Sequence, residues 1–186
     1  MKTKTLFVVL LSFIAMSASA QKIKPAPTFL KGEQEINILF DYSTVVFDGD
    51  SQAEYYKYKG AEWVEEWEGA HRKENANSFT QSLNDELKKV KVYAGNYPNA
   101  IYTVIVDVLD CDFGAYAGPM SVPAKLKCTI RVVKTGTTET LASVTLKESQ
   151  NPYSAIGTPI DFHRMYLAFG EVGEELGEML GKILKK

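Results

Sequence analysis

Cysteine and histidine are scarce in this chain of 186 residues, and each shortage excludes a class of protein. Two cysteines, Cys111 and Cys128, are too few for a disulfide-rich scaffold. Neither lies near the amino terminus, where an acylated cysteine would anchor a bacterial lipoprotein. The histidines, His71 and His163, have no second histidine or cysteine at the spacing of metal ligands. We therefore expect no metal, no cofactor and no lipid anchor.

The chain also has no excess of basic over acidic residues. Lysine and arginine total 21 against 23 aspartates and glutamates, which gives a formal net charge of −2. Nucleic acids and anionic membrane surfaces both favour a strongly basic face. Neither is expected as a partner of this chain.

Long apolar runs are confined to the amino terminus. The run from Leu6 to Leu11 continues to Met16 and stays shorter than the roughly 20 residues that a membrane span needs. Two lysines precede it and Ser17-Ala18-Ser19-Ala20 follows it, an order typical of a cleavable signal peptide. We expect removal of residues 1–20 between Ala20 and Gln21, which leaves a periplasmic or secreted protein without a membrane span.

The remaining pattern predicts one α+β domain. Residues 21–34 contain two prolines and no apolar period, and are expected to form an extended leader that stands off from a domain over 35–186. Alternating apolar residues predict strands, and apolar residues three or four apart predict helices. The strands are expected near 35–42, 101–113, 124–132 and 141–147, and the helices near 62–90 and 162–183. This order, β-α-β-β-β-α, predicts a two-layer domain with a mostly antiparallel sheet of about four strands and two helices.

Three local features are expected within these elements. The apolar face of the second strand changes parity, which predicts a β-bulge near Val108 to Asp110. The first helix has a weak point near Gly69 or near residues 75–77. Small residues four apart in the last helix predict its close approach to the sheet or to the first helix; these are Gly173, Gly177 and Gly181.

The order of elements, the segment Ala100 to Val106 and the strand 126–133 with its glycine-containing turn together resemble small exported Gram-negative envelope proteins. Their domain is similar to the amino-terminal domain of TolB and to some outer-membrane assembly lipoproteins. The resemblance implies a non-enzymatic module that binds a partner in the cell envelope. This chain lacks the acylated cysteine of the lipoproteins, so the resemblance does not extend to a membrane tether.

Two functions are compatible with the residues. The first is an exported, non-enzymatic binding or assembly module whose partner is an envelope protein or a cell-wall or sugar ligand. The second is a hydrolase built on dispersed carboxylates such as Glu68, Asp107 and Asp110. The acidic group formed with Asp112 would equally suit an exposed strand edge that discourages sheet pairing. The sequence indicates no oligomeric state.

The segment Asp48 to Ala61 is the expected recognition site of a binding module. It joins the first strand to the first helix and, with the start of that helix, is rich in tyrosine and tryptophan, which concentrate at recognition surfaces. The candidate binding residues are Tyr55, Tyr56, Tyr58, Trp63 and Trp67. The same tyrosines would also fit an added hairpin arm or a cap on the core.

The two cysteines are a candidate disulfide. An antiparallel hairpin centred near Gly118-Pro119 would set Cys111 opposite Cys128, and both fall on the expected inward face. An exported protein meets oxidising conditions, and closing a loop of this size would add about 3 kcal/mol. The alternative is a pair of reduced thiols in the core.

Overall fold

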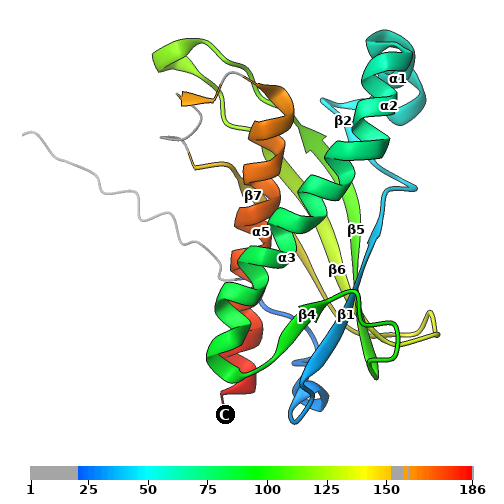
Figure 1. Cartoon of the computed structure of the whole chain (residues 1–186), viewed down its shortest axis with the longest axis vertical. Coiled ribbons are helices and arrows are strands. Elements are labelled where there is room, and N and C mark those ends of the chain that lie inside the picture. Colours follow the sequence, from blue (N-terminus) through cyan, green and yellow to red (C-terminus); the bar gives the residue numbers. More distant parts are fainter. Residues whose placement is uncertain (1–20, 152–156, 159, 186) are drawn as a thin grey trace, which may run out of the picture.

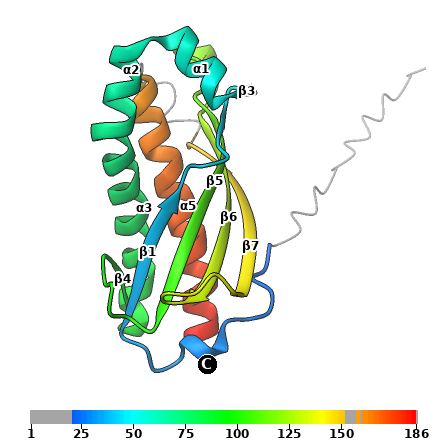
Figure 2. The same ribbon diagram turned by 90° about the vertical axis from the view of Figure 1, so that its right-hand side faces the viewer.

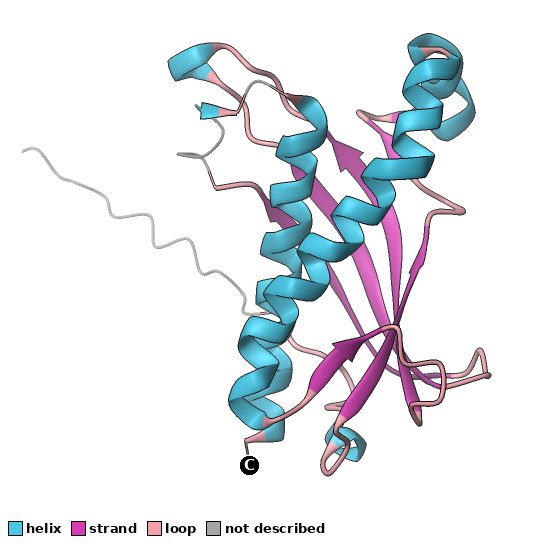
Figure 3. Cartoon of the chain, in the orientation of Figure 1, coloured by secondary structure: helices cyan, strands magenta, loops and turns pink. Residues whose placement is uncertain are grey.

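The computed structural model describes residues 21–151, 157–158 and 160–185. The domain has two layers, as Figure 3 shows by colour: a twisted sheet, and helices laid along it. Helices α3 (Arg72–Leu87) and α5 (Asp161–Leu184) cover one face of the sheet (Figures 1 and 2). Within the described ranges the other face carries no helix. The predicted α+β, two-layer class is confirmed.

The sheet has seven strands and is mixed. Strands β5, β6 and β7 form the expected antiparallel meander, whereas β1 and β2 both run parallel to β5 and β4 runs parallel to β1. The bounds are β1 (Glu35–Asp41), β2 (Val46–Phe47), β3 (Asp50–Ser51), β4 (Tyr93–Gly95), β5 (Tyr102–Asp112), β6 (Lys125–Lys134) and β7 (Thr140–Ser149).

The prediction of about four strands in the order β-α-β-β-β-α is therefore wrong. Most paired residues do lie on antiparallel strands, as expected, but the parallel pairing of β1 with β5 was not foreseen. A long helical crossover separates β1 from β5, and such a connection brings two strands together in parallel. Strands β2, β3 and β4 have only two or three residues each, too few for an alternating pattern to reveal them.

The predicted β-bulge is confirmed. The register of β5 against β6 shifts between Val108 and Asp110, so Val108 pairs with Cys128 and Cys111 pairs with Leu126. The shift keeps Val108 and Cys111 on the buried face although their numbers differ in parity.

The bulge also determines how the cysteines lie, and the expectation that Cys111 stands directly opposite Cys128 is wrong. The two are diagonal neighbours, and diagonal pairs on antiparallel strands lie about 7–8 Å apart, beyond the usual Cα separation of a disulfide. In the structure both are buried, free thiols. Burial raises the pKa of both, that of Cys128 to about 12.

The predicted first helix is confirmed over nearly its whole length. It comprises α2 (Ala61–Glu66), a π-helical turn (Trp67–His71), α3 and a 3-10 turn (Lys88–Val90). The π-helical turn contains Gly69, the first of the two expected weak points. Helix α1 (Gln52–Lys59) precedes it and was not foreseen; Ser51 and Glu54 cap its start reciprocally.

The expected close approach of the last helix is confirmed against α3. A Cβ atom on Gly173 would lie 2.2 Å from the carbonyl oxygen of Phe79, and one on Gly177 would lie 2.7 Å from Cβ of Glu86. Only glycine allows the two backbones to come this near. Gly181, by contrast, faces open space.

The leader packs against the domain rather than standing off from it. Lys24 and Ser143 of β7 exchange two backbone hydrogen bonds of 2.9 Å, and Ile23 and Leu30 are buried. A 3-10 turn (Thr28–Leu30) carries the chain below the sheet toward β1. The expected signal peptide spans residues 1–20, which lie outside the described residues. Its presence and its cleavage after Ala20 therefore stay predictions. None of the described helices is long and apolar enough to cross a membrane.

Candidate binding surface at the β5–β6 loop

The five aromatic residues expected at a recognition site differ widely in exposure. Tyr55 and Trp67 are buried in the core, and Tyr56 and Trp63 are half-buried. Tyr58 alone of the five is mostly exposed, at 80%. The structure therefore favours a core-capping role for Tyr55 and Trp67.

These side chains belong to an aromatic cluster at the upper end of the sheet. Its rings contact one another with centroids between 5.2 and 6.4 Å apart. The members come from β2, α1, α2, the π-helical turn, the residue after β5 and the start of α5: Phe47, Tyr55, Tyr56, Trp63, Trp67, Phe113 and Phe162. The ring contacts pack α1, α2 and the start of α5 against β2 at this end of the sheet.

Asp48 ties the cluster to the end of β5. It lies with Gly49 in a two-residue turn between β2 and β3, where both have positive φ, as Asp-Gly turns of tight hairpins do. One carboxylate oxygen accepts the hydroxyl of Tyr55 at 2.9 Å, and the other accepts the backbone N–H of Phe113 at 2.8 Å. Asp48 thereby fixes the point at which the β5–β6 loop begins.

A second anchor holds the same point from α5. Arg164 is only 2% exposed, and its Nε donates to the carbonyl oxygen of Phe113 at 3.0 Å. Gly114 follows with a φ of +63°, and a Cβ there would lie 2.2 Å from the carbonyl oxygen of Val122. Two polar anchors and one obligatory glycine thus set the direction of the loop.

The loop from Gly114 to Pro123 is ordered by its own hydrogen bonds. Ala115 and Val122 exchange backbone hydrogen bonds of 3.1 and 2.8 Å. The hydroxyl of Ser121 accepts from the N–H of Ala117 and donates to the carbonyl of Gly118, across a 3-10 turn (Gly118–Met120). These hydrogen bonds hold the loop in one conformation without a partner, which lowers the entropic cost of binding one.

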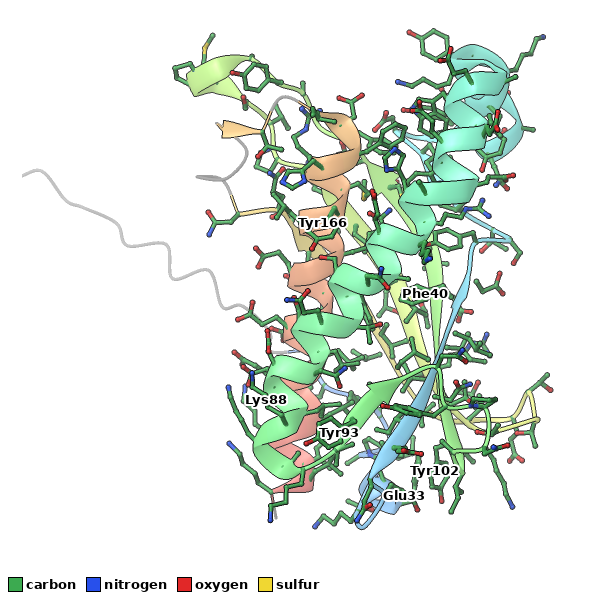
Figure 4. All side chains as sticks on the ribbon, viewed as in Figure 1. Glu33, Phe40, Lys88, Tyr93, Tyr102 and Tyr166 are labelled. Atoms are coloured by element: carbon green, nitrogen blue, oxygen red, sulfur yellow. The ribbon has the colours of Figure 1, made fainter. Side chains whose placement is uncertain are left out.

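Three large apolar side chains of this loop face solvent. Tyr116 is 49% exposed, Met120 81% and Val122 44%; we call them the β5–β6 surface. Figures 1 and 2 place the loop at the end of the molecule opposite β4, where Tyr93 is labelled in Figure 4. Apolar groups gathered on an exposed, ordered loop are typical of an interaction site.

An acidic hollow adjoins the β5–β6 surface. It has a volume of about 390 Å³, and Ala115 and Val122 line it together with three carboxylates, those of Asp48, Asp110 and Asp112. Burial and then the charge of Asp112 raise the pKa of Asp110. One oxygen of Asp110 is buried with no hydrogen-bond partner in the described part of the chain. The hollow therefore brings three carboxylates together, and Lys125 pairs with one of them, that of Asp112, at 3.3 Å.

The carboxylates of the hydrolase hypothesis do not meet. Asp107 lies on the open face of the sheet in a two-point ion pair with Arg131, and Glu68 accepts from Arg72 on the helical side. Asp110 lines the acidic hollow, whereas neither Asp107 nor Glu68 does. Among the described residues, no group of three or more acidic, histidine or cysteine side chains is placed to hold a metal ion.

Sequence reasoning missed the β5–β6 surface because it treated residues 114–123 only as a turn. A usable signal was present: Tyr116, Met120 and Val122 fall within seven positions of a segment punctuated by glycine and proline. Turns are normally polar, so large apolar residues in one indicate contact with something else.

No family model matches the sequence, and no curated protein sequence matches it. Among solved structures, a PelC dodecamer from Paraburkholderia phytofirmans is similar with a TM-score of 0.45 at 7% identity, over 83% of this chain and 96% of that chain. A single-residue variant of the same PelC gives a TM-score of 0.42 at 9% identity, over 84% and 95%. Values this low identify neither a family nor a function, and the resemblance to the TolB domain stays a prediction.

Proposed function

We propose that the chain is an exported, non-enzymatic binding or assembly module of the cell envelope that docks a partner protein on the β5–β6 surface. Export rests on the signal-peptide pattern of residues 1–20. The observation that carries the docking role is the exposure of Tyr116, Met120 and Val122 on a loop fixed by Asp48 and Arg164.

The chemistry of this surface favours a protein over a sugar. Methionine and tyrosine are enriched at protein interfaces, and methionine adapts its shape to an apolar neighbour. Met120 and Val122, two of the three side chains of the surface, offer no polar group to a cell-wall or sugar ligand. The carboxylates of the adjoining hollow favour a partner segment with lysine or arginine beside its apolar residues.

Site-specific photo-crosslinking in cells that express the full chain tests this function. Tyr116 and Tyr93 are matched positions, since they are 49% and 52% exposed and lie at opposite ends of the domain. With p-benzoylphenylalanine at each position in turn, we expect a discrete crosslinked protein from position 116 and none from position 93.

A further variant tests whether the adduct reports docking. Met120→Asp places a charge in the β5–β6 surface and should abolish the crosslink from position 116 without changing the melting temperature. The proposed function is contradicted if position 116 yields no discrete product, if position 93 yields the same one, or if Met120→Asp leaves the product unchanged.

A further inference from the structure

Methionine exposure differs sharply within the described part of the chain. Met120 is 81% exposed, whereas Met165 is 0% and Met179 is 8% exposed, both on the core-facing side of α5. An oxidant in solution reaches a thioether in proportion to its exposure. Among the described methionines, Met120 is thus the thioether that oxidants reach first, and it belongs to the β5–β6 surface.

We propose that Met120 is a site of reversible oxidation and that its oxidation weakens docking at the β5–β6 surface; this inference rests on the proposed function. The oxidant is a peroxide. A lone pair on Sδ attacks one peroxide oxygen, an S–O bond forms and the O–O bond breaks. The departing oxygen leaves as water after taking up the proton of the transferred oxygen. Sulfur loses two electrons and the peroxide gains two.

The consequence follows from the change in polarity. The thioether is apolar, but the sulfoxide has a strong hydrogen-bond acceptor that an apolar partner surface leaves unsatisfied. Met120 is the most exposed of the three side chains that define the β5–β6 surface, so the new polar group falls on that surface. We expect docking to weaken by about tenfold or more, the equivalent of one lost apolar side chain.

Oxidation should leave the fold intact. The hydrogen bonds that shape the loop come from backbone groups and from the hydroxyl of Ser121, and Met120 contributes only its backbone N–H, bonded to Ala117. The side chain of Met120 is not needed to hold the loop. The melting temperature should therefore stay unchanged. A methionine sulfoxide reductase supplied with a thiol reductant should restore docking: the thiols give two electrons and two protons, become a disulfide, and the sulfoxide oxygen leaves as water.

The first experiment needs no partner. The purified full chain is treated with dilute hydrogen peroxide, and sulfoxide is measured by peptide mass spectrometry over time. We expect Met120 to oxidise roughly tenfold or more faster than Met165 and Met179, in proportion to exposure. Equal rates at the three sites would overturn the proposal.

The second experiment uses the photo-crosslinker at position 116. Peroxide treatment should reduce the crosslinked product, reductase should restore it, and the variant Met120→Leu should keep the product before and after peroxide. A product that survives oxidation of Met120 overturns this inference and leaves the proposed function standing. No product from untreated protein overturns both.

Discussion

The α3–α5 contact and the β5–β6 loop each depend on glycine, but glycine has opposite effects on apolar surface in the two regions. In the helix pair, Gly173 and Gly177 remove side chains so that two buried surfaces touch. In the loop, Gly114 lets the backbone turn so that apolar side chains face outward. The first arrangement removes apolar surface from water and stabilises the fold, whereas the second leaves it exposed. Surface of the second kind contributes to binding rather than to folding.

The largest effect is expected where the helices touch. Gly173→Ala would place a methyl group 2.2 Å from the carbonyl oxygen of Phe79, so α5 must move away from α3. Overpacking of this kind costs about 1–3 kcal/mol, occasionally more, in the free energy of unfolding. Chemical denaturation of the purified protein measures it.

The matched control for this helix is Gly181→Ala. Nothing lies within 4 Å of a Cβ at this position, and alanine favours a helix over glycine by about 0.5–1 kcal/mol. This variant should be as stable as the original chain or slightly more stable. If both alanine variants lost similar stability, the contrast between Gly173, which contacts α3, and Gly181, which has room for a methyl group, would be refuted.

The anchor of the loop gives the next largest effect. Arg164→Met keeps a long side chain but removes the donor to the carbonyl of Phe113, and an unsatisfied buried carbonyl costs about 1–3 kcal/mol. The backbone N–H groups of Ala115 and Val122 should then exchange with deuterium faster than those of β1. Unchanged exchange at the loop would show that Asp48 alone holds it.

Alkaline pH should lower the stability of the fold through the two cysteines in the core of the sheet. Burial raises the pKa of Cys128 from 9.0 to about 12 and raises that of Cys111 as well, so the folded chain keeps both thiols protonated. The unfolded chain loses these protons from about pH 9, near the ordinary thiol pKa. Their contribution to stability is therefore full below pH 9 and is lost as the pH rises toward 12.

Denaturation curves between pH 8 and 12 measure this loss, and Cys128→Ala should show a smaller fall over the same range. At pH 8 a thiol reagent should label neither cysteine in the folded chain and both after unfolding without reductant. No labelled thiol in the unfolded chain would show that the pair is oxidised, contrary to the free thiols of the structure.

Elements with a clear period were predictable, and strand direction was not. The alternation of Leu126, Cys128 and Ile130 and the parity change after Val108 follow from which side chains face the core, and the structure confirms both. Whether β1 runs parallel to β5 depends on where the intervening helix delivers the chain, which apolar periodicity does not encode. Strands β2 and β3 depend on the turn at Asp48-Gly49, a signal that the sequence contained.

The aromatic residues expected to bind a partner lie at the same end of the molecule as the β5–β6 surface, but Tyr55 and Trp67 among them are buried in the core. Tyr55 and its neighbours were singled out for residue type, yet whether an aromatic ring is buried depends on residues distant in sequence. Phe113 and Phe162 come from the end of β5 and from α5, and they enclose the aromatic cluster from the other side. Met120 lies outside this cluster and is exposed, although methionine is usually buried in protein cores.

The smallest effect is expected on the β5–β6 surface itself. Tyr116→Ser removes an exposed ring that makes no hydrogen bond or ring contact within the described ranges, so the free energy of unfolding should change by less than about 0.5 kcal/mol. Tyr93→Ser, at the opposite end and equally exposed, should behave alike in denaturation. The two variants should differ only in docking, which can be read from a photo-crosslinker at position 122. Tyr116→Ser should weaken that crosslink while Tyr93→Ser leaves it unchanged. A fall in stability specific to Tyr116→Ser would mean that the ring serves the fold, and the contrast between the loop and the helix contact would fail at the residue where it should be strongest.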